Sequence, residues 1–197
     1  MSEKIRCTWC SGDPLYTKYH DEEWGVPIHD SQKLFEFLIL EGAQAGLSWI
    51  TILRRREAYR EAYDNFDPKK IARWSEAHIE KLMQDKRIIR NRRKILSAKN
   101  NAECFLQMQG GGAQAGTQHS KDHGGDFSAW LWNFVDNVPI KNHFTANDTL
   151  PAFTPLSTKI SDALKEKGFS FVGPTIIYAF MQAVGMVNDH VDTCFRA

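Results

Sequence analysis

The sequence has no apolar run that approaches the ~18 residues of a membrane-spanning helix, and its first residues, Met1-Ser2-Glu3-Lys4, lack the apolar stretch of a signal peptide. Only four of its 197 residues are cysteines. We therefore expect a soluble cytoplasmic protein that does not act at a membrane, with thiols or metal ligands instead of disulfides. A net charge of +1 gives no indication of a nucleic-acid partner by itself.

The chain is rich in aromatic residues and in segments with helical periodicity. The hydrophobic fraction is 42%, with six Trp, five Tyr and twelve Phe, which is enough to form a hydrophobic core. We expect a single domain of residues 1–197, which could consist of two helical lobes. No segment alternates as a β-strand does. Apolar spacing and capping residues predict helices that begin near Ser31, Ser48, Asp67, Ser75, Arg90, Phe127, Ser157 and Pro174. Residues 109–125 are polar and aperiodic and are predicted to be a flexible insertion. We predict an all-α fold.

Basic residues are concentrated in two segments. Eight Lys and Arg lie between Lys81 and Lys99, against one acid, Asp85. Four more arginines lie in residues 54–60. Such density is typical of a surface that binds phosphates, and equally of a solvated helix face.

Two pairs of potential metal ligands lie far apart in the chain. Cys7 and His20 form one pair, and His190 and Cys194 form the other. Two thiolates and two imidazoles are a common structural zinc set. The second pair has i, i+4 spacing and would share a helix face if that segment were helical. Cys7 and Cys10 form a CxxC pair, a spacing found in zinc and redox sites, so spacing alone leaves the ligand set open.

A tight turn between two helices is predicted near residues 168–173. Backbone N–H groups just before the helix that opens at Pro174 would suit a phosphate, because the donors and the helix dipole point the same way. This arrangement resembles the helix-hairpin-helix element of DNA glycosylases.

Five longer motifs extend that resemblance over nearly the whole chain outside residues 109–125. They are DPLYxxYHDxEWGVP at 13–27, LEGxQAGLSW at 40–49, IIRNRRKI at 88–95, GFxFVG at 168–173 and NDHV at 188–191. Together with RCxW at 6–9, they resemble the constitutive (type I) 3-methyladenine DNA glycosylases. The resemblance implies a monomeric, monofunctional enzyme that flips 3-methyladenine out of double-stranded DNA and releases it, leaving an abasic site.

The resemblance also implies a base pocket. A 3-methylated adenine in DNA is cationic, and electron-rich aromatic faces attract a cationic ring. Tyr19 and Trp49 would sandwich the base, and Tyr16, Trp9 and Trp24 would wall the pocket. These aromatics could instead be ordinary core residues.

Glu41 is the expected catalytic residue. By resemblance it accepts hydrogen bonds from the base edge and gains from the charge of the ring; otherwise it is a surface residue at a helix end. The turn at 168–173 has no lysine, so a Schiff-base step is not expected. Asp189 lies near the position of the usual catalytic Asp of the superfamily, which this family is described as lacking, and we assign no water activator.

The remaining assignments concern DNA and metal. Resemblance and charge together indicate DNA contacts at Gly46, Leu47, Arg90, Arg92, Arg93 and Gly173. Resemblance favours His20 over Cys10 and gives one closed, structural zinc held by Cys7, His20, His190 and Cys194.

A non-catalytic helix-hairpin-helix DNA-binding protein is the main alternative, but it would need no aromatic pocket with a carboxylate. A zinc hydrolase would need an open coordination position, which four ligands do not leave.

Overall fold

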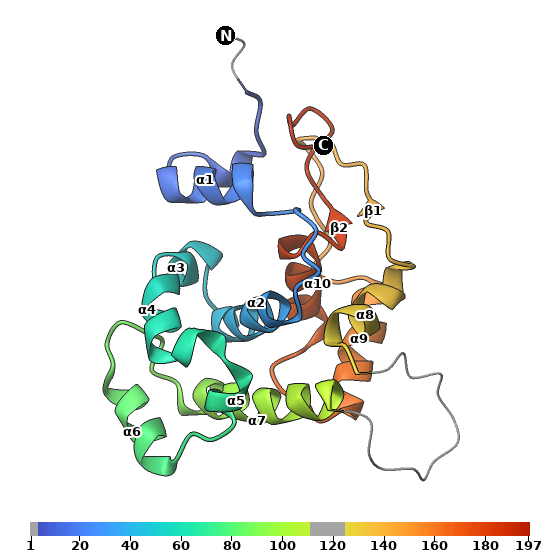
Figure 1. Ribbon diagram of the computed structural model, residues 1–197. Helices are drawn as coiled ribbons and strands as arrows, with labels where there is room; N and C mark the ends of the chain where they lie inside the picture. Colours follow the sequence, from blue (N-terminus) through green and yellow to red (C-terminus); the bar gives the residue numbers. More distant parts are fainter. Residues whose placement is uncertain (1–3, 111–124) are drawn as a thin grey trace, which may run out of the picture.

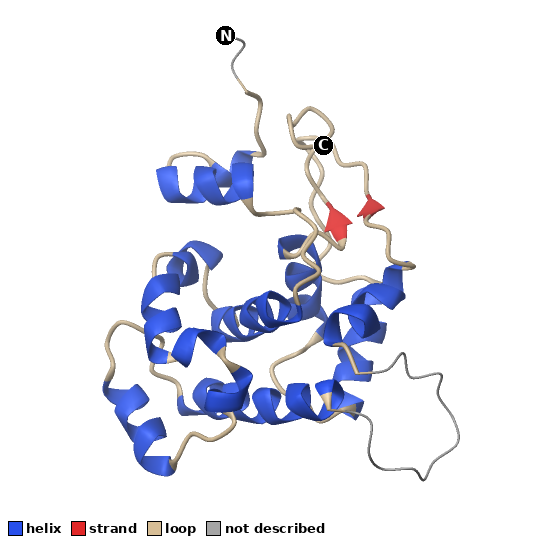
Figure 2. Cartoon of the chain, in the orientation of Figure 1, coloured by secondary structure: helices blue, strands red, loops and turns tan. Residues whose placement is uncertain are grey.

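The computed structural model describes residues 4–110 and 125–197, and this part of the chain is mostly helical, as predicted (Figures 1 and 2). Its α-helices are α1 (Pro14–Glu22), α2 (Ser31–Gln44), α3 (Trp49–Leu53), α4 (Arg56–Ala62), α5 (Pro68–Ile71), α6 (Glu76–Gln84), α7 (Arg92–Gln109), α8 (Phe127–Trp132), α9 (Pro155–Glu166) and α10 (Pro174–Ala183). The 3-10 helices are η1 (Thr8–Cys10), η2 (Asp64–Phe66) and η3 (Asn133–Val135). The all-α prediction missed two short strands, β1 (Ile140–Lys141) and β2 (Val187–Asn188), which pair in parallel. None of the described helices is both long and apolar enough to span a bilayer.

Helix α2 is the centre of the fold and packs against α3, α7, α8 and α10 (Figure 1). Its residues from Phe37 to Ala43 are all buried, as expected of a helix that is covered on every side. The cap is Asp30 and not the predicted Ser31, because the Asp30 carboxylate accepts the Lys33 N–H at 2.7 Å. The helix also continues past Gly42 to Gln44, which places Glu41 inside a buried helix instead of at its end.

The predicted pair of helices around residues 168–173 is present as α9 and α10, which pack against each other. Gly168 ends the first helix with φ +88°, where a residue with a side chain would be strained. The turn is held to α7 by Asn101, whose Oδ1 accepts from the Ser170 N–H (2.8 Å) and whose Nδ2 donates to the Ser170 carbonyl (2.9 Å).

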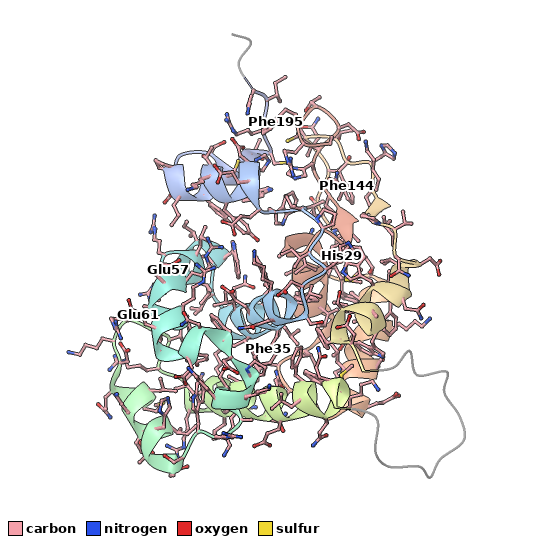
Figure 3. The ribbon with its side chains drawn as sticks, viewed as in Figure 1. His29, Phe35, Glu57, Glu61, Phe144 and Phe195 are labelled. Carbon is pink, nitrogen blue, oxygen red and sulfur yellow. The ribbon has the colours of Figure 1, made fainter. Side chains whose placement is uncertain are left out.

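The segment after β2 returns to the beginning of the described chain. The Phe195 N–H donates to the Ile5 carbonyl at 3.0 Å, and Phe195 lies beside the N-terminal segment in Figure 3. Residues 190–194 are not helical, so the i, i+4 explanation for this pair is wrong: a bridge between Phe144 and Val191 keeps the chain extended before it turns. The predicted insertion at 109–125 falls mainly on residues 111–124, outside the described part.

Candidate functional site

One pocket collects all five aromatic candidates and Glu41. It has a volume of about 270 Å³ and lies between the N-terminal segment, α2, α3 and α10. Its lining residues are Trp9, Tyr16, Tyr19, Trp24, Glu41, Gln44, Trp49, Leu150, Ala179, Gln182 and Ala183. The structure therefore brings together residues that are spread over most of the chain.

Edge-on aromatic contacts build the wall that the N-terminal segment contributes. Trp9 contacts Tyr16 and Trp24, with ring centroids 4.8 and 5.0 Å apart. On the other side, the Tyr19 and Trp49 rings lie 5.5 Å apart at 46° and contact each other. In this conformation the two rings do not enclose a base, so a sandwich would require them to separate.

Glu41 is the only carboxyl side chain among the described residues that line the pocket. It is 3% exposed, and burial raises the pKa of its carboxyl to about 8. Its Oε2 atom is buried and receives no hydrogen bond from any described residue. A buried acceptor without a donor is costly unless a ligand supplies one. Glu41 is thus arranged to receive a donor from something that enters the pocket.

Helix α10 supplies a wall that the sequence analysis missed. Ala179, Gln182 and Ala183 are spaced i, i+3 and i+4, so they share one helix face, but that spacing does not indicate that the face lines a pocket. The Gln182 Nε2 group donates to Asp189 at 2.8 Å. Leu150, from the loop before α9, closes the same side and carried no signal in the sequence.

Asp189 is buried and all of its bonding is internal. Its Oδ2 accepts from the Tyr178 hydroxyl (2.6 Å) and from Gln182, and its Oδ1 accepts from Asn142 Nδ2 (2.6 Å). Burial, and then the bond to Asp189, raise the pKa of Tyr178, so its hydroxyl stays a donor. Because three protein groups donate to this carboxylate, it holds Tyr178, Gln182 and Asn142 together and is not placed to activate water.

The predicted DNA-contact residues lie along the ends of α2, α7 and α10. Leu47 is exposed just after α2, and Gly46 has φ +79°. The Lys94 ammonium donates to the carbonyls of Ala43 (2.8 Å) and Ala45 (2.7 Å), which fixes the beginning of α7 beside the end of α2. Gly173 is the N-cap of α10 and offers no side-chain cap.

The three arginines differ in their surroundings. Arg90 and Arg93 are exposed and pair with no acid in the described part of the chain. Arg92 instead forms ion pairs with Glu76 and Glu80. Its charge is therefore partly neutralised, whereas the charges of Arg90 and Arg93 are available to phosphates.

The four predicted metal ligands form one buried cluster. The ligand atoms of Cys7, His20, His190 and Cys194 all lie within 4.8 Å of one another. The Cys194 sulfur lies 3.5 Å from His20 Nε2 and 3.5 Å from His190 Nδ1, and the Cys7 sulfur lies 3.6 Å from His190 Nδ1.

These separations suit a zinc ion. Tetrahedral bonds of about 2.3 Å to sulfur and about 2.0–2.1 Å to nitrogen put adjacent S and N ligands roughly 3.6 Å apart. Burial lowers the pKa of His190 to about 4, so its imidazole is neutral at pH 7, the form that binds metals. The Cys10 sulfur lies outside this cluster and donates to the Cys7 carbonyl at 3.1 Å.

Supporting groups orient the two histidines. His20 Nδ1 lies 2.9 Å from the Asp21 carboxylate, which Arg6 in turn contacts at 2.8 Å. A carboxylate behind a histidine ligand fixes which nitrogen faces the metal. The cluster therefore has ligands of the right type, at the right distances, with oriented rings.

Comparison with known proteins agrees with the pocket. The methyladenine glycosylase family matches residues 9–197. DNA-3-methyladenine glycosylase 1 of Escherichia coli K12 is 49% identical over 96% of this chain and 95% of its own length. DNA-3-methyladenine glycosylase of Haemophilus influenzae is 45% identical over 96% of both chains.

Solved structures show the same similarity. A crystal structure of 3-methyladenine DNA glycosylase I superimposes with a TM-score of 0.88 at 48% identity, and covers 97% of this chain and 98% of the other. The Staphylococcus aureus enzyme, solved to explain its recognition of 3-methyladenine, gives a TM-score of 0.86 at 34% identity and covers 97% and 95%.

Proposed function

This chain belongs to the methyladenine glycosylase family and is a DNA glycosylase that releases 3-methyladenine, and we propose that the pocket around Glu41 performs this reaction. The observation that carries the proposal is the buried Oε2 of Glu41, an acceptor without a protein donor in an aromatic pocket. A flipped adenine offers donors on its edge that could satisfy it.

The charge of the substrate explains the composition of the pocket. Methylation at N3 makes the base cationic, which weakens its bond to the sugar and makes it a good leaving group. The faces of Trp9, Trp24 and Trp49 attract such a ring, and Glu41 gains a charge-assisted hydrogen bond. A cation beside Glu41 lowers its pKa, so the carboxylate ionises as the base binds.

The reaction ends at an abasic site, because the described residues around the pocket supply no nucleophile for a lyase step. Neither residues 168–173 nor the described pocket lining contains a lysine. A Schiff base with the sugar therefore has no nucleophile here. Water takes up the sugar cation, and Asp189 is too fully hydrogen-bonded to be its activator. The pocket also argues against a protein that only holds DNA.

Contacts to double-stranded DNA are proposed along one continuous edge. The unit formed by α9, residues 168–173 and α10 serves as a helix-hairpin-helix element, with N–H groups after Gly173 facing a phosphate. Arg90 and Arg93 add positive charge near the end of α2, and Leu47 is exposed there. Helices α2 and α10, near whose ends these groups lie, also line the pocket that receives the flipped base.

One zinc ion is proposed for the cluster of Cys7, His20, His190 and Cys194. When bound, it would cross-link two distant segments through four protein ligands. A closed set leaves no position for substrate, so the ion supports the fold and takes no part in catalysis. The fit of the four ligand atoms to zinc geometry supports this proposal.

A base-release assay tests the function. The purified protein is incubated with methylated duplex DNA, and the freed purines are separated by chromatography while the DNA is examined for breaks. We expect free 3-methyladenine and unbroken abasic strands. Strand cleavage with an adduct trapped by borohydride would contradict the monofunctional reaction, and no released base would favour a DNA-binding protein without catalysis.

A further inference from the structure

We propose that Gln182 is a specificity-determining residue whose side-chain carbonyl selects adenine over guanine, with Asp189 as the residue that positions it. The inference rests on the proposed function, because it assigns a role within the same base pocket. Gln182 lines that pocket from the same face of α10 as Ala179 and Ala183, and its backbone carbonyl accepts from the Gly25 N–H at 3.0 Å, next to Trp24.

The orientation of the Gln182 amide follows from its partner. Asp189 is 2% exposed and, as a carboxylate, only accepts hydrogen bonds. The group 2.8 Å from its Oδ2 must therefore be the amide nitrogen of Gln182 and not the oxygen. The carbonyl oxygen Oε1 then points away from Asp189 and accepts no hydrogen bond from a described residue. It is the polar atom that Gln182 offers to the pocket.

Asp189 is itself held from two other directions. Tyr178 and Asn142 donate to it from α10 and from the segment after β1, both at 2.6 Å. A carboxylate with donors on both oxygens cannot rotate without breaking a bond. Gln182 thus has an orientation fixed by a buried network and not by contact with solvent.

Such an orientation discriminates between the two purines. Adenine carries an exocyclic amino group, a donor, at the position where guanine carries the acceptor O6. The Gln182 carbonyl can accept from the amino group but is repelled by O6. A site built to accept from an N–H group rejects an analogue that lacks it far better than an apolar wall does. Glu41 responds to the charge of the base, which adenine and guanine methylated at N3 both carry, so a second acceptor that reads the amino group adds discrimination.

Three variants test the inference. Gln182→Met keeps the length of the side chain but removes the acceptor. Asp189→Asn allows the amide to reverse, since an asparagine can donate to Oε1 and leave the Nε2 hydrogens facing the pocket. Asp67→Ala is the control: it removes the N-cap bond that Asp67 accepts from the Lys69 N–H at the beginning of α5, and it leaves the pocket and the bonds of Asp189 in place.

Release of 3-methyladenine and of 3-methylguanine is measured for each protein on methylated DNA. Affinity for free 3-methyladenine is measured by quenching of tryptophan fluorescence. We expect Gln182→Met to weaken this affinity roughly fivefold, as for one hydrogen bond, and to lower the ratio of released adenine to guanine by a similar factor or more. Asp189→Asn should also lower the ratio, whereas Asp67→Ala should lower only the melting temperature.

The outcomes separate this inference from the function on which it rests. Wild-type protein that releases no base would overturn both. Wild-type protein that releases 3-methyladenine, with an unchanged purine ratio in Gln182→Met, would overturn the role of Gln182 alone. A ratio that falls equally in Asp67→Ala would show that Asp189 acts through general stability and would overturn its positioning role.

Discussion

The imidazole of His190 joins the Cys/His cluster to the base pocket through a hydrogen bond from its Nε2–H to the Trp24 carbonyl at 3.2 Å. A carbonyl oxygen only accepts, so the hydrogen resides on Nε2. Nδ1, which faces Cys7 and Cys194, therefore has a free lone pair, as a metal ligand requires. Because Trp24 also lines the pocket, the cluster supports one wall of the site.

Zinc content and stability should fall together when a ligand is removed. We expect about one zinc per chain, and we expect Cys194→Ser to lose it and to lose stability on the order of 3–5 kcal/mol, as for other lost metal sites. Cys10→Ser is the matched control, because serine keeps a donor to the Cys7 carbonyl. Metal analysis and thermal melting measure both effects. Stable wild-type protein without zinc, or zinc loss in the control alone, would contradict the proposed ligand set.

Glu41→Gln should slow base release without unfolding the protein. The change keeps the size of the side chain but removes the charge, which should cost about 1.5–3 kcal/mol of interaction with a cationic base. Single-turnover release of 3-methyladenine measures the rate. Glu22→Gln, at an exposed carboxyl, should leave the rate unchanged. Equal rates for Glu41→Gln and the wild type would remove Glu41 from the site.

The same substitution should stabilise the unliganded protein at high pH. Burial raises the pKa of Glu41 from 4.5 to about 8, so the folded state resists its ionisation. The favourable contribution is fully present below pH 4.5 and is lost as the pH rises to about 8. The stability of Glu41→Gln relative to the wild type should increase over that interval, by a few kcal/mol at most. Denaturant unfolding at pH 5 and pH 8.5 tests it; a constant difference would mean that Glu41 is not desolvated.

DNA binding should weaken with salt, and the arginines should contribute unequally. Arg90→Gln and Arg93→Gln should each reduce the slope of log K against log salt by about one, because each removes a phosphate contact. Arg92→Gln should have a smaller effect, since Glu76 and Glu80 already pair with it. Arg87→Gln serves as a control, because Arg87 is paired with Asp85 and Glu61. Binding titrations at several salt concentrations provide the slopes, and equal slopes for all variants would contradict this assignment.

Local sequence patterns predicted the helices well and the contacts between distant segments poorly. Apolar spacing and caps located α6, α9 and α10 because those signals act within a few residues. Cys7 and His190 are 183 positions apart, and no local rule pairs them; resemblance did. The i, i+4 spacing of His190 and Cys194 would have indicated a shared face only in a helix, and the segment is not helical because Val191 pairs with Phe144. Gln182 was missed because its role depends on Asp189, which only the folded chain brings beside it.

The cluster that links Cys7 to His190 also has a consequence for the order of events during synthesis. A ribosome adds roughly 5–20 residues each second, so the 183 positions between these two ligands correspond to a delay on the order of ten to forty seconds. For most of that delay Cys7 and His20 are already made, while His190 and Cys194, the other half of the proposed ligand set, are not. The wall formed by Trp9, Tyr16 and Trp24 therefore lacks the hydrogen bond between His190 and the Trp24 carbonyl until His190 has been made. A nascent chain completes its damage-recognising pocket only after α10 and His190 have been synthesised.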